Sequence, residues 1–416
     1  MTILIKNVLL DDKETDVFVK GNRIEKISPN LQIEAEKIID GNGKAIIPSF
    51  INGHSHAAMT LLRGFADDMP LMKWLQEKIW PTEEKLTRED VYWGTRLACL
   101  EMIKTGTTFF NEMYWHFEGI ADAVEDSGVR AAISSVMIGF VDEQSSQNQI
   151  KRNEYLFRKS KEYSDRIVFC LGPHAIYTVE KDGLMWAKEF ADNNDVMIHL
   201  HLCETKQEVD DCLEKRGRRP VEYLADIGLL GPNVIAAHGV WLSEKELDIL
   251  KKHDVKVIHN PASNMKLAVS SALKYNSMKR KGIKVGLGTD GCSSNNNLDM
   301  LEEMKIASLL QKHDSKSATE LTADEAFSMA TSIGAEIFGL DCGKIEEGKL
   351  ADFILVDLQK PELTPNYNLI SNLVYSANGS CVDTTVCNGH VLMENRIVKD
   401  EKKILEKANE IAKKLA

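Results

Sequence analysis

The sequence predicts an α/β fold: a (β/α)8 barrel of the TIM type with a small β-sandwich domain formed by both chain ends. The 416 residues are enough for one barrel of about 250 residues and an added module. Short β-rich runs alternate with amphipathic segments through the middle of the chain, and hairpin-like strands recur at its two ends. Together these observations favour a barrel inserted between two halves of a smaller domain.

Candidate strands for the barrel lie at residues 45–51, 107–113, 129–138, 167–173, 196–202, 233–238, 255–259 and 283–289. Most are continuously apolar, which is typical of parallel strands buried on both faces. Amphipathic segments such as 88–104 and 298–312 separate them and are expected to form outer helices. Such units in series predict a closed barrel. An open doubly wound sheet is the alternative, but no G-x-G-x-x-G motif follows the first strand.

The two chain ends have a different pattern from the middle. Residues 16–24 are expected to form a hairpin with a Gly-Asn turn, and similar strands return at 348–356 and 384–398. Neither end is long enough to bury a core alone, so we expect them to pair. The predicted domains are a composite β-sandwich of residues 1–49 and 343–416, which ends in a charged helix, and a (β/α)8 barrel of residues 50–342.

Composition limits the class of protein. The formal net charge of −12 argues against nucleic acid or an anionic membrane as a partner, because both need basic patches. No apolar run approaches the roughly 18 residues of a membrane span, and the first residues suggest a strand rather than a secretory leader. The eight cysteines lie far apart without a C-x-x-C pair, as expected of a reduced chain. We therefore expect a cytoplasmic protein.

A pair of histidines, His54 and His56, lies where an apolar run ends, and on an extended segment both imidazoles point the same way. Alone, such a pair is more often two polar loop residues than a metal site. The ends of other predicted strands add His201, His238 and Asp290. Because reactive side chains of barrel enzymes converge at the C-terminal ends of the strands, this coincidence predicts a metal site.

Longer motifs surround these positions along nearly the whole chain. They are residues 53–60 (GHSHAAMT), 63–68 (RGFADD), 79–81 (IWP), 259–261 (HNP), 263–267 (SNMKL), 288–291 (GTDG) and 294–300 (SNNNLDM). On these motifs the chain resembles the amidohydrolase superfamily, and more narrowly its 5-methylthioadenosine/S-adenosylhomocysteine deaminase branch. Relatives that act on other aminated rings share much of the same pattern.

The resemblance implies a mononuclear metal site with four ligands, namely His54, His56, His201 and Asp290. We expect one divalent ion per subunit, with zinc first and Fe2+ or Mn2+ as alternatives, because such a site accepts all three. Binuclear relatives carry a carboxylated lysine at the end of strand 4. This chain has Gly172-Pro173-His174 at that point, so a single metal is expected.

The resemblance also implies three catalytic residues, Asp290, Glu204 and His238. Asp290 would accept a proton from the metal-activated water, and His238 would orient that water. Glu204 would protonate the ring nitrogen and pass a proton to the departing ammonia as a general acid/base. Glu204 and Asp290 would therefore also contact the substrate.

Four other positions are expected to bind substrate. His174 matches a family position that contacts the nucleoside. Glu83 matches the residue that holds the ribose hydroxyls, and a carboxylate accepts two such hydrogen bonds well. Trp74 and Ser294 are expected to line the base or sugar pocket.

One position departs from the family pattern. An arginine that faces the amino-acid end of S-adenosylhomocysteine aligns with Ser135 of this chain. Loss of the guanidinium removes a bidentate clamp for the carboxylate. Substrates without that carboxylate, such as 5'-methylthioadenosine, 5'-deoxyadenosine or adenosine, would be affected less.

We therefore expect a homo-oligomeric, metal-dependent hydrolytic deaminase of 5'-substituted adenosines that releases the inosine analogue and ammonia. The substrates implied are 5'-methylthioadenosine and S-adenosylhomocysteine, with 5'-deoxyadenosine or adenosine as further candidates. The alternative is an aminohydrolase or chlorohydrolase of another ring, such as guanine, a pterin or an s-triazine, but a ribose-binding Glu83 serves no purpose there. A barrel that has lost catalysis is a third interpretation, although every expected ligand is present.

Three neighbouring polar residues have plainer explanations. His199 shares the inward face with His201 but lies one layer deeper, so we expect a satisfied interior histidine rather than a ligand. Asp67 and Asp68 belong to a motif of the branch, yet a loop cap or a salt bridge is as good an explanation as contact with substrate.

Overall fold

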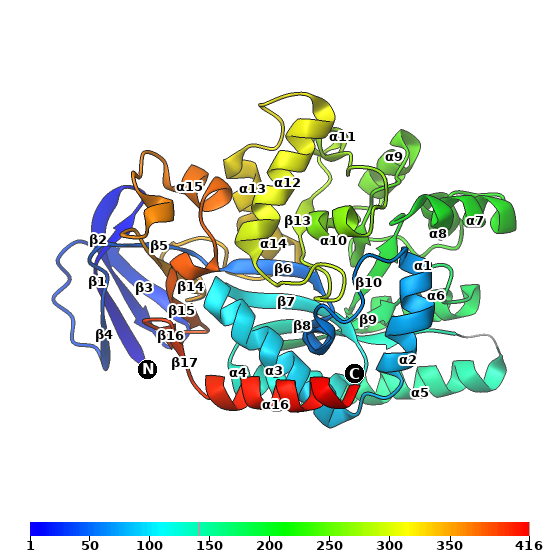
Figure 1. The fold of residues 1–416 in the computed structure, drawn as a ribbon, viewed down its shortest axis with the longest axis horizontal. Helices are drawn as coiled ribbons and strands as arrows, with labels where there is room; N and C mark the ends of the chain where they lie inside the picture. Colours follow the sequence, from blue (N-terminus) through cyan, green and yellow to red (C-terminus); the bar gives the residue numbers. More distant parts are fainter. Residues whose placement is uncertain (140–141, 416) are drawn as a thin grey trace.

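The structure is a computed structural model that describes residues 1–139 and 142–415 (Figure 1). It contains the predicted barrel of eight parallel strands, which follow one another in chain order. They are β6 (Phe50–Ser55), β7 (Thr107–Tyr114), β8 (Arg130–Met137), β9 (Ile167–Pro173), β10 (Met197–Leu202), β11 (Val234–His238), β12 (Lys256–His259) and β13 (Val285–Leu287). The N–H of Asp290, just after β13, donates to the carbonyl of His54 in β6 at 2.9 Å. This bond brings the last strand to the first and nearly closes the barrel.

A second, nine-stranded sheet is built from both chain ends, as predicted; we call it the chain-end sheet (Figure 1). Its strands are β1 (Thr2–Leu10), β2 (Lys13–Lys20), β3 (Arg23–Ser28), β4 (Lys37–Asp40), β5 (Lys44–Pro48), β14 (Phe353–Asp357), β15 (Val382–Cys387), β16 (His390–Glu394) and β17 (Ile397–Val398). β5 lies between β1 and β14, so the sheet continues from one end of the chain to the other. Gly21, at a φ of +62°, makes the predicted hairpin turn between β2 and β3.

The first predicted strand, residues 45–51, is in fact two strands in two sheets. β5 belongs to the chain-end sheet, whereas β6 begins the barrel at Phe50. Both parts are buried, so the apolar run continues across the point where the chain passes from one sheet to the other. His54 therefore lies inside the first barrel strand, and His56 directly follows it.

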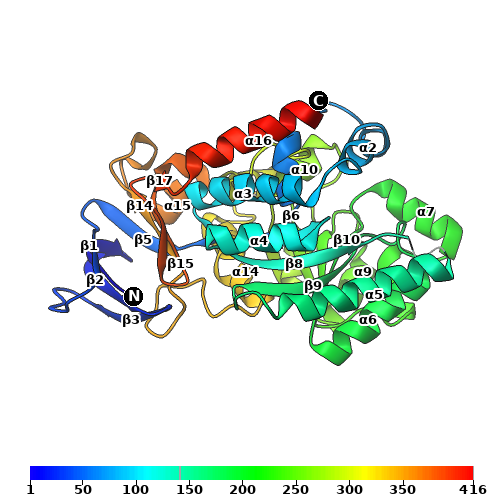
Figure 2. The same cartoon turned by 90° about the horizontal axis from the view of Figure 1, so that it is seen from below.

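Helices separate the barrel strands and cover the outside of the barrel (Figures 1 and 2). They are α3 (Arg88–Thr105), α4 (Phe117–Ser127), α5 (Glu143–Ser160), α6 (Lys181–Asn194), α7 (Lys206–Arg216), α8 (Pro220–Asp226), α9 (Glu244–Lys252), α10 (Pro261–Lys266), α11 (Tyr275–Lys281), α12 (Met300–Ser315), α13 (Ala323–Ala330) and α14 (Ser332–Ile337). α3 begins after Thr87 in a capping box with Asp90 and ends at Gly106, at a φ of +93°. Within the described ranges, no helix is both long and apolar enough to cross a membrane.

A helical segment between β6 and α3 extends the first β/α connection. It comprises η1 (Ala57–Leu62), α1 (Leu71–Trp74), the π-helical turn η2 (Leu75–Ile79) and α2 (Trp80–Glu83). Trp74 and Ile79 are buried, so the segment packs on the barrel through its apolar side chains. Glu83 is the last residue of α2.

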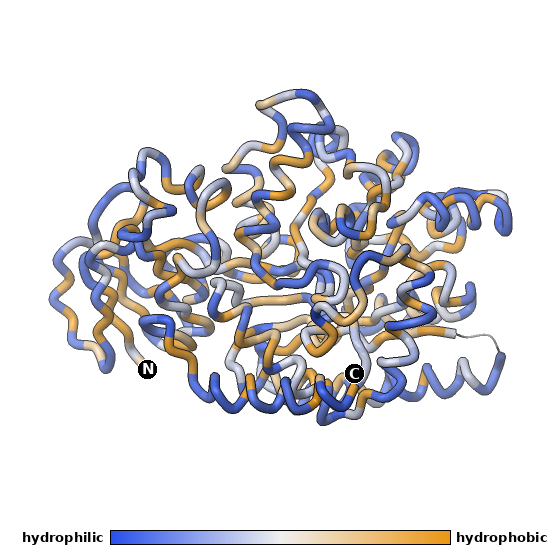
Figure 3. Tube along the Cα trace, in the orientation of Figure 1, coloured by the Kyte–Doolittle hydropathy of each residue, from blue (hydrophilic) through white to orange (hydrophobic). Residues whose placement is uncertain are grey.

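The last helix, α16 (Glu401–Leu415), lies along α3 of the barrel (Figure 2). Lys104 of α3 donates to Glu401 at 2.6 Å, and the inner face of α16 buries Ile404, Ala408 and Ile411. Most residues of α16 are hydrophilic, whereas those of the barrel strands are mostly hydrophobic (Figure 3). The connection from β14 to β15 contains η3 (Pro361–Leu363), α15 (Leu369–Tyr375) and η4 (Gly379–Cys381).

Candidate functional site

The C-terminal ends of four barrel strands bring together the histidines and the aspartate that the sequence singled out. His54 lies in β6 and His56 follows it; His201 lies in β10, His238 ends β11, and Asp290 follows β13. His56 is half-buried and the other four are buried. Residues far apart in the chain thus meet because parallel strands of a barrel all end at one face.

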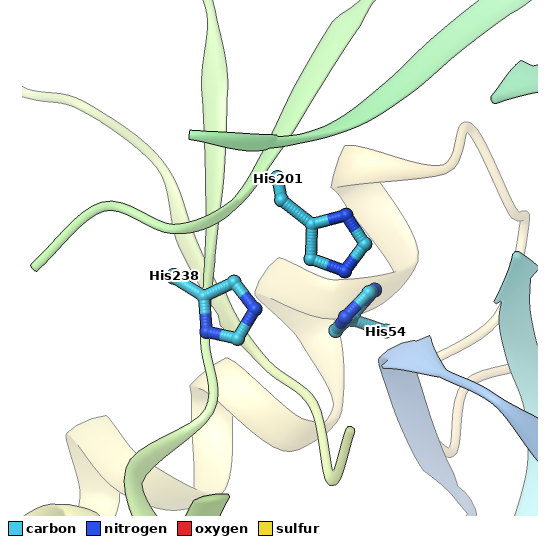
Figure 4. A group of neighbouring side chains, drawn as sticks. All are labelled: His54, His201 and His238. Atoms are coloured by element: carbon cyan, nitrogen blue, oxygen red, sulfur yellow. The ribbon is translucent and has the colours of Figure 1, made fainter. Parts of the chain in front are cut away.

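Nitrogen and oxygen atoms of these side chains face one another across a small space. Asp290 Oδ1 is 3.4 Å from His54 Nε2 and 3.2 Å from His56 Nε2, and His201 Nε2 is 3.3 Å from His56 Nε2. Two groups of three have ligand atoms within 4.8 Å of one another: His54, His56 and Asp290, and His54, His201 and His238. Figure 4 shows the rings of the second group turned toward a common point. Both groups contain His54, which places it at the centre of the cluster.

Backbone carbonyls set the orientation of two of the imidazoles. His56 Nδ1 donates to the carbonyl of Met113 at 2.6 Å, and His201 Nδ1 donates to the carbonyl of His174 at 2.9 Å. Because a carbonyl only accepts, each Nδ1 carries the proton, and in the neutral ring each Nε2 keeps its lone pair for the centre of the cluster. Histidine ligands of metals typically have such a partner behind them.

The donor set fits a metal ion. His54 Nε2 and His238 Nε2 are buried and have no hydrogen-bond partner among the described residues. Buried polar atoms are nearly always paired, so two unpaired nitrogens on one cluster indicate a missing partner. Imidazole nitrogens and a carboxylate oxygen are the ligands that zinc and similar divalent ions bind.

Burial and the nearby carboxylate give the histidines of the cluster different pKa values. Burial lowers the pKa of His54 to about 4 and that of His201 well below its ordinary value, so both rings are neutral, as metal ligands must be. Burial also disfavours the charged form of His56, but the neighbouring Asp290 carboxylate outweighs it and raises the pKa to about 9. Binding of a cation at this point would release that proton.

Serine hydroxyls hold the Asp290 carboxylate from the side away from the histidines. Oδ2 accepts from Ser263 Oγ at 2.6 Å and from Ser294 Oγ at 3.1 Å, while Oδ1 accepts from the N–H of Gly291 at 2.9 Å. Asp290 itself has a φ of +62°, a conformation that costs a non-glycine residue energy and clusters at functional sites. Ser294 was predicted as a pocket residue, whereas Ser263 was missed although it lies in the quoted 263–267 motif.

Glu204 and His238 face each other at the edge of the cluster, with 3.9 Å between Glu204 Oε2 and His238 Nε2. Burial raises the pKa of Glu204. Its backbone is held by Glu208, whose carboxylate accepts from the N–H groups of Cys203 and Glu204 at 2.9 Å each. His238 Nδ1 is 2.9 Å from Asn264 Oδ1, which accepts its proton. The sequence analysis gave no role to Glu208 or to Asn264, although Asn264 lies in the 263–267 motif.

A cavity opens beside the cluster and is lined by all four additional substrate-binding candidates, Trp74, Glu83, His174 and Ser294. Trp115 Nε1 donates to Glu83 Oε2 at 3.4 Å, and burial raises the pKa of Glu83. His174 Nδ1 lies 3.0 Å from Thr178 Oγ1, and burial lowers the pKa of His174 to about 3, so its ring is neutral. The structure thus places every predicted site residue in the cluster or on the cavity wall.

The residues with plainer explanations lie behind or beside the site. His199 Nε2 is 3.0 Å from His54 Nδ1, and its Nδ1 is 2.9 Å from Asn111 Nδ2, so both its nitrogens are occupied deeper in the barrel. Asp67 forms a salt bridge with Lys266 of α10, in line with the alternative to substrate contact. Glu112, which the sequence did not point to, accepts from the N–H of Ala57.

Ser135, which aligns with the family arginine, is not among the described residues that line the cavity. Its neighbours Val136 and Ile138 do line it. Side chains alternate along a strand, so 136 and 138 share one face and 135 belongs to the other. Ser135 is therefore placed on the face of β8 that does not line the cavity.

Residues 45–392 match the model of the amidohydrolase family. The chain belongs to the amidohydrolase family. This amidohydrolase is 48% identical over 420 residues to 5-methylthioadenosine/S-adenosylhomocysteine deaminase 1 of Archaeoglobus fulgidus, covering 99% of each chain. It is also 48% identical over 416 residues to the 5'-deoxyadenosine deaminase of Methanospirillum hungatei, covering 98% of this chain and 93% of the relative. The prediction of a metal-dependent hydrolase acting on C–N bonds is confirmed.

A solved structure extends the likeness to three dimensions. The crystal structure of an adenosine deaminase from Xanthomonas campestris with bound zinc superposes on this amidohydrolase with a TM-score of 0.94. The two sequences are 33% identical, and the match covers 100% of this chain and 98% of that one. The predicted barrel fold is confirmed by this match and by the strand order of the amidohydrolase itself.

Proposed function

We propose that this amidohydrolase deaminates 5'-substituted adenosines hydrolytically, giving the inosine analogue and ammonia. The observation that carries the proposal is the meeting of three features in one cavity: a histidine and aspartate cluster, the Glu204–His238 pair and the Glu83 carboxylate. The names of the relatives from Archaeoglobus fulgidus and Methanospirillum hungatei agree with it.

The cluster would hold one divalent metal ion per subunit through four ligands, namely His54, His56, His201 and Asp290. Zinc is the expected ion, with iron or manganese as alternatives, and the zinc in the Xanthomonas structure supports this choice. When bound, the ion supplies a water molecule acidified toward neutral pH, which is the nucleophile that hydrolysis of an aromatic amine requires.

Three residues of the chain would move protons or aim the water. Asp290 accepts a proton from the attacking water, and His238, fixed by Asn264, holds that water in line with the carbon bearing the amino group. Glu204 protonates the ring nitrogen and then takes up the proton of the added hydroxyl as the carbonyl forms. It thereby helps to pass the proton held by Asp290 to the amino group, which leaves as ammonia. A buried carboxyl with a raised pKa is suited to this role because it retains its proton nearer to neutral pH.

The rest of the cavity would bind the nucleoside. Glu83 accepts hydrogen bonds from the ribose hydroxyls, a task with no counterpart in a free base or a triazine. His174 contacts the nucleoside as a neutral ring, and Trp74 and Ser294 line the pocket. Glu83 is therefore the residue that favours nucleosides over the alternative ring substrates.

Other properties follow from the same proposal. We expect a homo-oligomer in the cytoplasm, acting on a small-molecule nucleoside without a nucleic-acid or membrane partner. The net charge of −12 supports the absence of a nucleic-acid or anionic-membrane partner, and the eight free, buried cysteines support a reducing compartment.

The test is conversion of an adenosine to an inosine chromophore, followed by ultraviolet absorbance together with ammonia release. Glu204→Gln keeps the size of the side chain but removes its proton transfer, so kcat should fall by about 10²- to 10⁴-fold. Glu214→Gln, on the exposed face of α7, is the matched control and should leave kcat unchanged. A Glu204→Gln enzyme as fast as the control, or no ammonia from any adenosine, would refute the proposal.

A further inference from the structure

We propose that the end of the cavity away from the cluster selects uncharged 5' substituents and rejects a carboxylate, with Val136 and Ile138 as specificity-determining residues. This amidohydrolase would then act on nucleosides with a 5'-methyl or 5'-alkylthio group in preference to S-adenosylhomocysteine. The inference rests on the proposed function and narrows its substrate class.

The lining residues indicate which end of the cavity binds which part of the nucleoside. His201, Glu204 and Asp290 lie at one end, where the amino group of the base must be placed. Glu83 lies on α2 beside Trp115, the residue that follows β7, and marks the ribose. The 5' substituent must leave the ribose toward the part of the lining that neither the base nor the ribose hydroxyls use.

That remaining wall is apolar. It is formed by Leu71 and Leu75 of the segment after β6, by Val136 in β8 and by Ile138 just after β8. No lysine or arginine is among the described residues that line the cavity. The residues outside the described ranges are Phe140, Val141 and Ala416, and none of them has a cationic side chain.

The ionisable side chains that line the cavity offer no cation to a carboxylate at this end. Glu83, Glu204 and Asp290 are carboxyl groups, and His56 belongs to the cluster at the other end. Lys266, the neighbour of the lining residue Leu267, is held by the Asp67 carboxylate and the Asn296 amide oxygen. A carboxylate on the 5' substituent would therefore lose its water and meet apolar or acidic groups without a cationic partner.

Desolvation decides the size of the effect. A buried carboxylate without a partner is far more costly than a buried methyl group, which gains free energy from burial. We therefore expect kcat/KM for S-adenosylhomocysteine to lie at least about 100-fold below that for 5'-methylthioadenosine.

The experiment compares three nucleosides on the purified, metal-loaded full chain: 5'-methylthioadenosine, 5'-butylthioadenosine and S-adenosylhomocysteine. The butylthio compound has a chain of similar length to homocysteine but no charge. Its kcat/KM should stay within about 10-fold of the methylthio compound, while S-adenosylhomocysteine is poor both as substrate and as competitive inhibitor.

Several outcomes would overturn the inference. Turnover of S-adenosylhomocysteine within 10-fold of 5'-methylthioadenosine would show that the wall accepts a carboxylate, and it would leave the proposed function intact. Equal weakness of the butylthio compound and S-adenosylhomocysteine would show that length, and not charge, limits the cavity. If all three nucleosides are inert, the proposed function itself fails and the inference with it.

A variant tests the wall directly. Val136→Arg supplies the missing cation, so the ratio of kcat/KM for 5'-methylthioadenosine to that for S-adenosylhomocysteine should fall by at least about 10-fold. Val136→Met adds length without charge and should keep the wild-type ratio. Equal ratios in the two variants would argue against Val136 as a specificity residue, and the comparison of nucleosides does not depend on either variant folding.

Discussion

The two ends of the barrel bury polar side chains in opposite ways. At the N-terminal ends of the strands, where the barrel meets the chain-end sheet, Arg130 Nε donates to Asp352 Oδ2 at 2.7 Å. Arg130 Nη2 also donates to Asn388 Oδ1 at 2.6 Å, and the N–H of Asn388 donates to Asp352 Oδ1 at 2.5 Å. Arg130 and Asp352 therefore both have protein partners.

At the C-terminal ends, buried polar atoms remain without partners. His54 Nε2 and His238 Nε2 have none among the described residues. Burial is equally deep at both ends, since Arg130 is 5% exposed and His238 is 1% exposed. Depth of burial therefore does not distinguish the site from a structural contact, whereas unpaired nitrogens gathered in one histidine cluster do.

The largest effect is expected when a proposed metal ligand at the C-terminal ends of the strands is removed. His201→Ala should abolish stoichiometric metal binding and lower kcat by on the order of 10³-fold or more, because the attacking water is no longer acidified. Metal content by mass spectrometry and the absorbance assay measure both. His313→Ala, at an exposed position of α12, is the control. Full activity in the His201 variant would contradict the assignment of a catalytic metal site to the C-terminal ends of the strands.

Substitutions at the N-terminal ends of the barrel strands, where the buried polar groups are paired, should lower the stability of the protein and leave its activity unchanged. Arg130→Met leaves the buried Asp352 carboxylate without its charge partner, so the free energy of unfolding should fall by about 3–5 kcal/mol. Urea denaturation measures this change. Arg218→Met breaks the exposed pair with Asp226 and should cost less than about 1 kcal/mol. Similar losses in the two variants would mean that the buried pair contributes no more than a surface pair.

Glu83 tests whether the polar groups of the cavity act on substrate. Glu83→Ala should raise KM for a 5'-substituted adenosine by about 10- to 100-fold, as expected for lost hydrogen bonds to a charged acceptor. The metal content should not change, because Glu83 is not part of the cluster. An unchanged KM for the nucleoside would favour a substrate without ribose.

The smallest expected effect concerns Glu208, a carboxyl that supports the site from behind. Burial raises its pKa from 4.5 to about 8 despite hydrogen bonds from two backbone N–H groups. Between these values the folded protein retains a proton that the unfolded chain has lost, so stability falls as the pH rises through this window. In Glu208→Gln the free energy of unfolding should therefore fall less between pH 5 and 8 than in the wild-type protein, by on the order of 1–3 kcal/mol.

Urea denaturation at several pH values provides the measurement for Glu208. Glu214→Gln, on the same helix but exposed, is the matched variant and should keep the slope of the wild-type protein. Parallel curves for the two variants would show that Glu208 is ionised in the folded protein and that burial does not dominate its environment.

Much of the site could be predicted from the sequence because its residues lie at the ends of strands. His54 and His56 share a face through the period of two, and His201, His238 and Asp290 end or follow apolar runs. The positions of Glu83 and His174 came from the family motifs, and the cavity includes both. Local pattern and motif therefore predict where functional side chains leave the strands.

The residues that hold the site in place could not be predicted in the same way. Ser263, Asn264 and Glu208 reach their partners through loops whose course no local pattern shows. The break in the run 45–51 was missed for a similar reason, since burial in two different sheets produces one uninterrupted apolar run. The change of sheet depends on pairing with strands far away in the chain.

The sequence by itself determined the barrel, the composite sheet of the two ends and the set of candidate ligands, because strand period and strand-end chemistry are local properties. Only the tertiary structure decided that Val136 and Ile138, and not Ser135, line the cavity. It also decided which buried nitrogens remain unpaired. The facing of a strand and the pairing of a buried atom depend on neighbours that the fold brings from elsewhere in the chain.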